Sequence, residues 1–237
     1  MNLTGRTLLV TGAGGGLGQS LVRYCLRNNA EKVYCCARDT AKLEELKKTH
    51  HAIEVCRLDI TDTAEVRALA DAIKTIDILI NNAGINSGKR VFDPSFADFE
   101  VNVSGTLNVC RELSPKISPN GAIVTISSIL ALTNFPLMGL YSASKSALHS
   151  LTQAMRAELA HRGIEVYEVL PGPIDTDMTK DLPMPKSSPE TVAEMIFKGI
   201  EGKSYEIYPD PFSQTIRAAL LNDPASIEAD FARSVQE

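Results

Sequence analysis

The sequence predicts an α/β fold in which helices cover both faces of a doubly wound parallel sheet. Short β-rich segments alternate with helical patterns along the 237 residues, and a glycine-rich turn follows the first β-rich segment. Strand–helix alternation requires right-handed crossovers, which place successive strands parallel to one another. We therefore expect about seven strands in a three-layer α/β/α arrangement.

The expected elements follow from the local spacing of apolar residues. Runs rich in β-branched residues predict strands at 7–10, 32–37, 54–58, 76–80, 122–126, 164–169 and 205–208. Apolar residues at helical spacing predict helices at 16–27, 41–48, 64–73, 96–113 and 142–161. A further helix is expected after Tyr208.

No linker, internal repeat or low-complexity tract divides the chain, so we expect a single domain that spans residues 1–237. The segment 177–189 (DMTKDLPMPKSSP) is rich in proline, lysine and serine. It suits either a short mobile lid over a substrate or an ordinary surface loop. Ser188 and Pro189 then suit the N-cap and the first position of another helix.

Composition and charge exclude several classes of function. The formal net charge is −5, and no basic run suggests nucleic acid or anionic lipid as a partner. No apolar run has the length that spans a membrane, and the first predicted strand leaves no room for a signal peptide. The five cysteines follow no metal or disulfide spacing, so we expect reduced thiols in a cytoplasmic protein. The histidines (His50, His51, His149 and His161) match no metal site, and we expect them to be exposed on helix faces or ends.

The turn after the first predicted strand reads TGAGGGLG, from Thr11 to Gly18. Glycines at a strand–helix junction permit a tight turn and let the backbone approach a pyrophosphate, which the N-terminus of the next helix can bind. The spacing is T-G-x-x-x-G-x-G, because Leu17 takes the place of the last glycine in the commoner G-x-G-x-x-G pattern. The alternative interpretation is a flexible turn without a ligand.

Candidate proton-transfer chemistry lies in Tyr141 and Lys145, which are four residues apart in a predicted helix and so share one face. A free tyrosine titrates near about pH 10, too high for ready proton exchange at neutral pH, and a nearby ammonium favours the phenolate. A serine at the end of the preceding strand, Ser127 or Ser128, can hydrogen-bond the oxygen that gains or loses the proton. Taken alone, this spacing equally suits a surface pair on an amphipathic helix.

Together these motifs resemble the classical short-chain dehydrogenase/reductase family, and the likeness covers nearly the whole chain. The family's cofactor loop matches the glycine turn, and its NNAG motif matches residues 81–84. The segment PGPIDT at 171–176 is similar to the part of the family that closes over the nicotinamide. The resemblance implies a Rossmann-type fold and a hydride transfer between a nicotinamide cofactor and a carbonyl or alcohol.

The resemblance also implies roles for single residues. Asn102, Ser128, Tyr141 and Lys145 match the family's catalytic tetrad. Tyr141 would exchange the proton with the substrate oxygen, and Lys145 would lower the tyrosine pKa and bind the nicotinamide ribose. Ser128 would position the substrate, and Asn102 would anchor a water that leads to solvent, although an amide satisfied by local backbone is the rival interpretation. The implied cofactor-binding residues are Gly12, Gly14, Gly16, Leu17, Gly18, Arg38, Asp59, Ile60, Asn82, Ala83, Gly84, Pro171, Gly172, Ile174 and Thr176, together with Tyr141 and Lys145.

Two further expectations concern the serine and the cofactor. The family's catalytic serine lies thirteen residues before the tyrosine, which selects Ser128 and leaves Ser127 for packing or backbone contacts. NADP is favoured over NAD, because the acid of NAD-binding members is replaced by Ala37 and Arg38 can pair with a 2′-phosphate. Against this, Gly15 occupies a place where many NADP-binding members are basic, and Asp39 could hold Arg38 in an ion pair.

The substrate expected from apolar residues near the tyrosine is a small to medium apolar ketone or aldehyde. These residues are Ile129, Leu130, Leu132, Leu137, Met138, Leu140, Ile174 and Met178, each with core packing as its rival. The alternative function is a non-catalytic dinucleotide-sensing regulatory protein of the same fold. Within the enzyme class, a sugar or a carrier-bound substrate is the alternative, and the lack of a basic cluster in the lid counts against the carrier. The resemblance further implies a homodimer or homotetramer built on the helices at 96–113 and 142–161.

Overall fold

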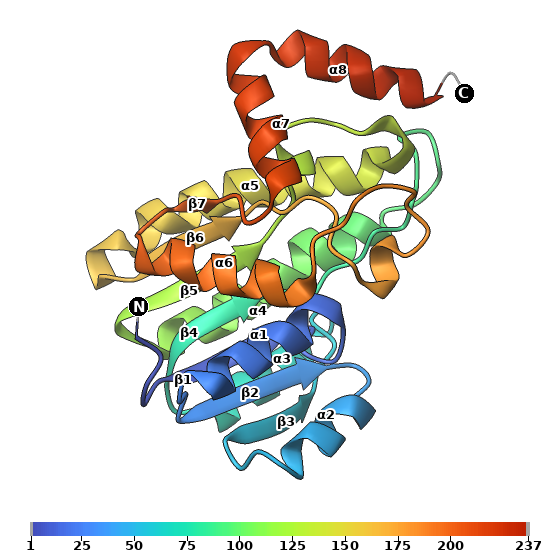
Figure 1. Ribbon diagram of the computed structural model, residues 1–237. Helices are drawn as coiled ribbons and strands as arrows, with labels where there is room; N and C mark the ends of the chain where they lie inside the picture. Colours follow the sequence, from blue (N-terminus) through green and yellow to red (C-terminus); the bar gives the residue numbers. More distant parts are fainter. Residues whose placement is uncertain (1, 236–237) are drawn as a thin grey trace.

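The computed structural model describes residues 2–235. It contains one seven-stranded sheet in the order β3-β2-β1-β4-β5-β6-β7, and every strand pair is parallel (Figure 1). The strands are β1 (Thr7–Thr11), β2 (Lys32–Ala37), β3 (Ile53–Arg57), β4 (Ile76–Asn81), β5 (Ile117–Ile126), β6 (Glu165–Val169) and β7 (Glu206–Ile207). The fold class expected from the sequence is confirmed.

Helices cover both faces of this sheet, as Figure 1 shows. The α-helices are α1 (Gly16–Arg27), α2 (Ala41–Lys47), α3 (Thr63–Ala72), α4 (Thr106–Leu113), α5 (Gly139–Leu159), α6 (Pro189–Glu201), α7 (Pro211–Asn222) and α8 (Pro224–Ala232). Shorter helical segments are η1 (Phe99–Gly105), η2 (Ser114–Lys116), η3 (Ile129–Ala131), η4 (Pro136–Met138), η5 (Ala160–Arg162), η6 (Asp177–Thr179) and η7 (Arg233–Val235). Within residues 2–235, no helix is long and apolar enough to cross a membrane.

The core forms two layers, one on each face of the sheet, because successive strand residues point to opposite faces. On β1, Leu8 and Val10 belong to the layer that contains α1 and α6, whereas Leu9 belongs to the layer that contains α3 and α4. All three side chains are fully buried. A strand that is covered on both faces reads as a continuous apolar run, which is why the sequence marks these strands so clearly.

The strand order of the sheet changes direction at the boundary between β1 and β4. Strands β2 and β3 extend the sheet to one side of β1, and β4 to β7 extend it to the other. In an open parallel sheet, ligands bind outside the carboxyl ends of the strands at such a switch point. The glycine turn after β1 and the NNAG segment after β4 therefore meet at the expected place.

The two largest departures from the predicted bounds concern β5 and the helix at 96–113. Strand β5 begins at Ile117 rather than at 122. Asn120, within this strand, has a positive φ of 59°. The register with β4 is irregular in this part, so the strand continues through the residues that predicted a turn. The predicted helix at 96–113 is divided into the π-helical segment η1 and the helix α4. At the junction, a Cβ on Gly105 would lie 2.7 Å from Ile60, so the wider η1 backbone passes close to the β3–α3 connection.

The C-terminal part contains the helix expected after Tyr208 as α7, followed by α8. Asp210 caps α7 and Asp223 caps α8 through their side chains, each before a proline. Ser188 accepts a hydrogen bond from the backbone N–H of Thr191 and caps α6, as predicted. In α8, the ring of Phe231 packs edge-on against Phe135, with the ring centroids 5.3 Å apart.

Candidate active site and cofactor cleft

The glycine turn is shaped by close backbone packing. Gly12 has a φ of +65°, and a Cβ there would lie 2.8 Å from Cα of Ala83. A Cβ on Gly18 would lie only 2.1 Å from the carbonyl oxygen of Gly12. Gly15 is the N-cap of α1, yet it provides no side-chain cap, and the first turn of the helix carries no acid. The turn thus presents uncapped backbone N–H groups, which suit the pyrophosphate of a dinucleotide.

The NNAG segment after β4 fastens this turn to the sheet. Asn82 donates from Nδ2 to the carbonyl oxygens of Thr11 and Gly12, both at 3.0 Å. The hydroxyl oxygen of Thr11 accepts hydrogen bonds from the backbone N–H groups of Asn82 and Ala83, both at 3.1 Å. These contacts join β1 to β4 at the switch point and hold the turn open toward the cleft.

A first cleft lies along β2 and β3. It is lined by the residues expected there from the sequence, namely Gly12, Gly14, Arg38, Asp59, Ile60, Ala83 and Gly84. Arg38 is exposed, and within residues 2–235 its guanidinium makes no hydrogen bond or ion pair. Asp39 instead accepts a hydrogen bond from the backbone N–H of Ala41 at 3.0 Å, which removes the expected competitor for Arg38.

Lys42 is a lining residue of this cleft that sequence reasoning missed. It is exposed in the first turn of α2, four residues after Arg38. The sequence contained a signal for it, because Lys42 follows Arg38 by four residues. Lys42 supplies from α2 the basic group that is missing at Gly15. On the opposite wall, hydrogen bonds from the N–H and hydroxyl of Thr61 lower the pKa of Asp59 and keep it charged.

A second cleft joins the glycine turn to the tyrosine and lysine of α5. Its lining includes Gly12, Gly16, Leu17, Gly18, Asn82, Ala83, Gly84, Ser127, Ser128, Tyr141, Lys145, Pro171, Gly172, Ile174, Thr176, Met178 and Thr179. Tyr141 and Lys145, together with Ser128, are therefore brought into the same cleft as the turn. Of the apolar residues considered for substrate contact, only Ile174 and Met178 line it, and Ile129 is a core residue with 1% exposure.

Lys145 is buried and donates from Nζ to the carbonyl oxygen of Ile126 at 2.9 Å. Its ammonium lies 5.7 Å from the centroid of the Tyr141 ring. Burial lowers the pKa of Lys145 to about 8, while the charges of Glu168 and Asp98 act in the opposite direction. The lysine is held in place by the protein backbone at the end of β5.

Tyr141 differs from the expectation that Lys145 lowers its pKa. Although part of the residue is exposed, burial of its hydroxyl end raises the pKa of Tyr141 to about 12. A hydrogen bond with Ser128 acts against this shift, and the charge of Asp98 adds to it. The reason is geometric, since Lys145 directs its Nζ to the Ile126 carbonyl rather than to the phenol oxygen.

The two serines face different neighbours. The hydroxyl oxygen of Ser128 accepts a hydrogen bond from the backbone N–H of Leu130 at 3.1 Å, which leaves its own proton to donate toward Tyr141 or a substrate. The hydroxyl of Ser127 is buried and acts on Glu168 of β6 without a hydrogen bond of ordinary geometry.

Asn102 is fully buried within η1. Its Nδ2 donates to the carbonyl oxygen of Ile85 at 2.9 Å and to the hydroxyl of Ser144 at 3.0 Å, and its Oδ1 accepts from the N–H of Ile85 at 2.8 Å. Both amide protons are thus committed to the protein, so the side-chain amide cannot donate to a bound water.

The segment after β6 closes the cleft. Gly172 donates its N–H to Asp210 at 2.8 Å, which fixes the start of the segment. Thr176 packs against the glycine turn, since a Cβ on Gly16 would lie 2.7 Å from its Cγ2. An isolated bridge joins Ile174, just before the segment 177–189, to Ser187 near the end of that segment.

The remaining expectations from the sequence concern the histidines and the cysteines. His149 was expected to be exposed, and this was wrong: it is half-buried and bonds Glu168. The other histidines are exposed as expected. All five cysteines are free thiols. Residues 2–235 contain no cluster of histidine, cysteine or acidic side chains that would hold a metal ion.

A dinucleotide fold whose phosphate turn opens into a Tyr–Lys–Ser cleft defines a nicotinamide-dependent oxidoreductase that acts on CH–OH groups. The chain belongs to the short-chain dehydrogenase family, which it matches over residues 6–186. It is 36% identical over 191 residues to a 3-oxoacyl-[acyl-carrier-protein] reductase of Rickettsia conorii, covering 77% of this chain and 78% of the relative.

Solved structures give the same result. A short chain dehydrogenase from Burkholderia cenocepacia in complex with NADP has a TM-score of 0.92 and 37% identity, over 98% of this chain and 99% of that one. A short-chain dehydrogenase/reductase from Burkholderia phymatum in complex with NAD has a TM-score of 0.82 and 24% identity, over 92% and 93% of the two chains. The second likeness supports the fold alone.

Proposed function

We propose that the protein is an NADP(H)-dependent carbonyl reductase that also oxidises the corresponding alcohols. Its substrate would be a small to medium apolar ketone or aldehyde. The observation that carries this proposal is the single cleft shared by the glycine turn, Ser128, Tyr141 and Lys145. Apolar contacts from Ile174 and Met178 suit the non-reacting part of such a substrate.

Each side chain has a distinct role in this proposal. Tyr141 donates the proton to the carbonyl oxygen during reduction and accepts it during oxidation. Ser128 donates a hydrogen bond to the same oxygen, since its own oxygen already accepts from Leu130. When bound, the nicotinamide supplies the hydride. Lys145 would bind the ribose through the N–H groups that its hydrogen bond to the Ile126 carbonyl leaves free.

The fit of a dinucleotide rests on the uncapped N-terminus of α1 and on the glycines that no larger residue could replace. NADP is proposed over NAD because Arg38 and Lys42 both lie along the cleft and no acid occupies position 37. The NADP complex of the 37% identical structure supports this choice. Water-mediated proton exchange at Asn102 would use atoms other than its committed amide N–H groups.

The remaining parts of the proposal concern the lid, the assembly and the compartment. We assign the segment 177–189 as a substrate lid on a single domain of residues 1–237, because Met178 and Thr179 line the cleft. A homodimer or homotetramer through α4 and α5 is proposed from the family resemblance. Five free thiols support a cytoplasmic location.

A carrier-bound 3-oxoacyl thioester is a second candidate substrate. Its support is the 36% identity to a reductase of such substrates. Lys180 of the lid is exposed, and so are Lys89 and Arg90, whose loop contacts the start of α5 through a hydrogen bond from the N–H of Leu140 to the Lys89 carbonyl oxygen at 3.1 Å. These cations could meet an acidic carrier, although they do not form one cluster in the lid.

The test is a panel of ketones, aldehydes, alcohols and 3-oxoacyl thioesters, free and carrier-bound, followed by the absorbance of the reduced nicotinamide. We expect NADPH-dependent reduction of at least one apolar ketone or aldehyde. Turnover of the carrier-bound thioesters alone would select the second candidate. Tight binding of NADPH without turnover of any carbonyl would overturn the proposal and favour the non-catalytic sensor.

A further inference from the structure

A stripe of three polar side chains runs along α5 toward the sheet. Tyr141, Lys145 and His149 follow one another at intervals of four residues and so lie on one helix face. Beneath Tyr141 and Lys145 lie Ser128 and the carbonyl oxygen of Ile126, both at the end of β5.

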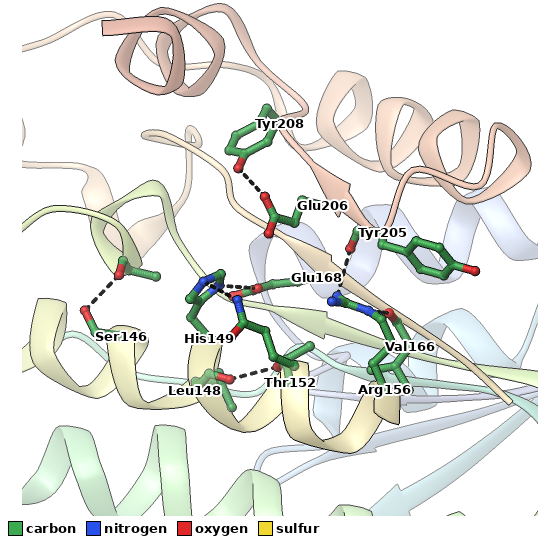
Figure 2. A network of polar contacts seen from close by, with 12 residues as sticks. Ser146, Leu148, His149, Thr152, Arg156, Val166, Glu168, Tyr205, Glu206 and Tyr208 are labelled. Carbon is green, nitrogen blue, oxygen red and sulfur yellow. Dashed lines mark hydrogen bonds and ion pairs between the residues drawn. The ribbon is translucent and has the colours of Figure 1, made fainter. Parts of the chain in front are cut away.

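His149 continues this stripe beyond the active site. Its Nδ1 lies 2.6 Å from Oε2 of Glu168 on β6, as Figure 2 shows. The histidine side chain is 19% exposed, whereas the Glu168 side chain is fully buried. On the outer side, Gln153 contacts Nε2 of the histidine at 3.0 Å. The buried carboxyl group of Glu168 is thus bonded by a histidine that is itself partly exposed.

Glu168 belongs to a row of buried polar residues on the face of the sheet beneath α5. It pairs in register with Thr125 of β5, which in turn pairs with Asn81 of β4. Oε1 of Glu168, Oγ1 of Thr125 and Oγ of Ser127 are all buried without a hydrogen-bond partner within residues 2–235. A buried carboxylate with an unsatisfied oxygen is costly, so its presence calls for a compensating charge.

Lys145 is the buried cation that lies next to this row. It donates to Ile126, whose neighbours on either side, Thr125 and Ser127, carry two of the unsatisfied hydroxyls. An ammonium has three N–H groups, and within residues 2–235 only the bond to Ile126 engages one of them. Of the charges that favour the protonated lysine, Glu168 is the stronger and Asp98 the weaker.

We propose that Glu168 is the buried counter-charge of Lys145, a positioning residue that keeps the lysine protonated beneath Tyr141, and that His149 holds the carboxylate in place. This inference rests on the proposed role of Tyr141 and Lys145 in proton transfer. Its consequence is that the charge of the active-site lysine depends on a residue that does not line the cleft.

Other charged groups around this pair are accounted for. On β7, Glu206 lies beside Glu168 in register, but its carboxylate accepts from Tyr208 at 2.7 Å and lies 3.9 Å from Arg217. Near Lys145, Asp98 is already held by hydrogen bonds from the N–H and hydroxyl of Ser87. Burial is the largest effect and leaves the pKa of Glu168 raised, while His149 and Ser127 act in the opposite direction and favour the charged carboxylate.

The test replaces Glu168→Gln, which keeps the size and removes the charge. Lysine labelled with ¹³C at Cε reports the titration of Lys145 by NMR in the cofactor-free protein, and the signal is assigned by its loss in Lys145→Arg. We expect the Lys145 midpoint to fall by about one pH unit in Glu168→Gln. Glu206→Gln, the matched control, should leave the midpoint in place. The alkaline limb of the rate profile should shift with the NMR midpoint.

A midpoint that moves by less than about 0.3 unit, or that moves equally in Glu206→Gln, overturns the counter-charge. Should Glu168→Gln fail to fold, His149→Leu removes the partner that favours the charged carboxylate, and the Lys145 midpoint should fall in the same direction. In that case, an unchanged Lys145 midpoint in His149→Leu overturns the counter-charge role of Glu168. A shifted midpoint in a protein that reduces no carbonyl would support the counter-charge and reject the proposed function, so the two failures are distinct.

Discussion

Lys145 donates a hydrogen bond to the backbone carbonyl of Ile126, and this 2.9 Å contact ties α5 to the end of β5. Ile126 lies one residue before Ser127 and two before Ser128, so Lys145, Ser128 and Tyr141 keep a fixed relation without any ligand. Because the acceptor is a backbone carbonyl at the end of β5, the direction of the ammonium is set by the fold. The cleft is therefore organised before a cofactor enters it.

The adjacent serines should differ sharply in their effect on turnover. Ser128→Ala should lower kcat by on the order of a hundredfold, because it removes a hydrogen-bond donor aimed at the reacting oxygen. Ser127→Ala should lower it far less, since that hydroxyl faces Glu168. Steady-state kinetics of both variants, with folding checked by circular dichroism, provide the measurement. Equal losses in two folded variants would mean that the serine roles are wrongly assigned.

The sequence identifies this site because several signals are local. The Tyr141–Lys145 spacing and the glycine turn each lie within one strand–helix unit, and the alternation along β5 separates Ser127 from Ser128. What spacing alone could not supply is contact between distant segments. The pairing of His149 with Glu168 joins α5 to β6, and an acid inside a strand has no local pattern that marks its partner.

Burial and helix placement explain two further differences from what the sequence led us to expect. The sequence led us to expect that Lys145 lowers the pKa of Tyr141, but burial of the phenol raises that pKa in the cofactor-free protein, and the group that acts against burial is Ser128. Lys42 was missed for a related reason, because only the packing of α2 on β3 brings it to the Arg38 side of the cleft. Burial and helix placement are tertiary properties that residue spacing does not encode.

Cofactor choice should depend on Arg38. A hydrogen bond to a charged group contributes roughly 1.5–3 kcal/mol, so one contact with the 2′-phosphate implies about a ten- to hundredfold preference for NADP. Ala37→Asp combined with Arg38→Ala should reverse this preference. Lys42→Ala alone should weaken NADP binding more than NAD binding.

Dissociation constants of both cofactors for each variant provide the measurement, with salt as a second variable. Since Arg38 and Lys42 are exposed, added salt should weaken NADP binding more than NAD binding in the natural protein. A natural protein that binds NAD as tightly as NADP would refute the role of Arg38.

Packing at the glycine turn predicts that Gly18→Ala is less stable to unfolding than Gly15→Ala. Gly18→Ala should cost about 1–3 kcal/mol of unfolding free energy, because its Cβ would meet the Gly12 carbonyl oxygen at 2.1 Å. Gly15→Ala is the matched control: no protein atom lies within 4 Å of a Cβ there, and its change should stay within about 0.5 kcal/mol. Denaturant unfolding without cofactor measures both. A Gly18→Ala protein as stable as the control would contradict the packing described for this turn.

The charge of Asp77 should make part of the free energy of unfolding depend on pH. Burial alone would raise its pKa, but hydrogen bonds from the N–H of Thr7 and the side chains of Ser118 and Arg6 outweigh burial and lower it. A depressed carboxyl pKa contributes stability above the unfolded value of about 3.9, and this contribution is lost as the pH falls through the folded value.

Asp77→Asn should therefore cost about 1–3 kcal/mol at pH 7, and its deficit relative to the natural protein should shrink as the pH falls below about 4. Asp71→Asn, at an exposed position of α3, should show little effect at either pH. Urea unfolding at several pH values measures this. A deficit that is independent of pH would show that the Asp77 charge is not responsible.

The central claim is that Tyr141 transfers the proton, and Tyr141→Phe tests it most directly because it removes the hydroxyl and keeps the ring. The measurement is kcat for NADPH-dependent reduction of the best carbonyl in the panel, together with the NADPH dissociation constant of the same protein. We predict that kcat falls by at least about a hundredfold, as expected for loss of a general acid, while NADPH binding changes by less than about threefold. A Tyr141→Phe protein that reduces this carbonyl at a near-normal rate would contradict the account.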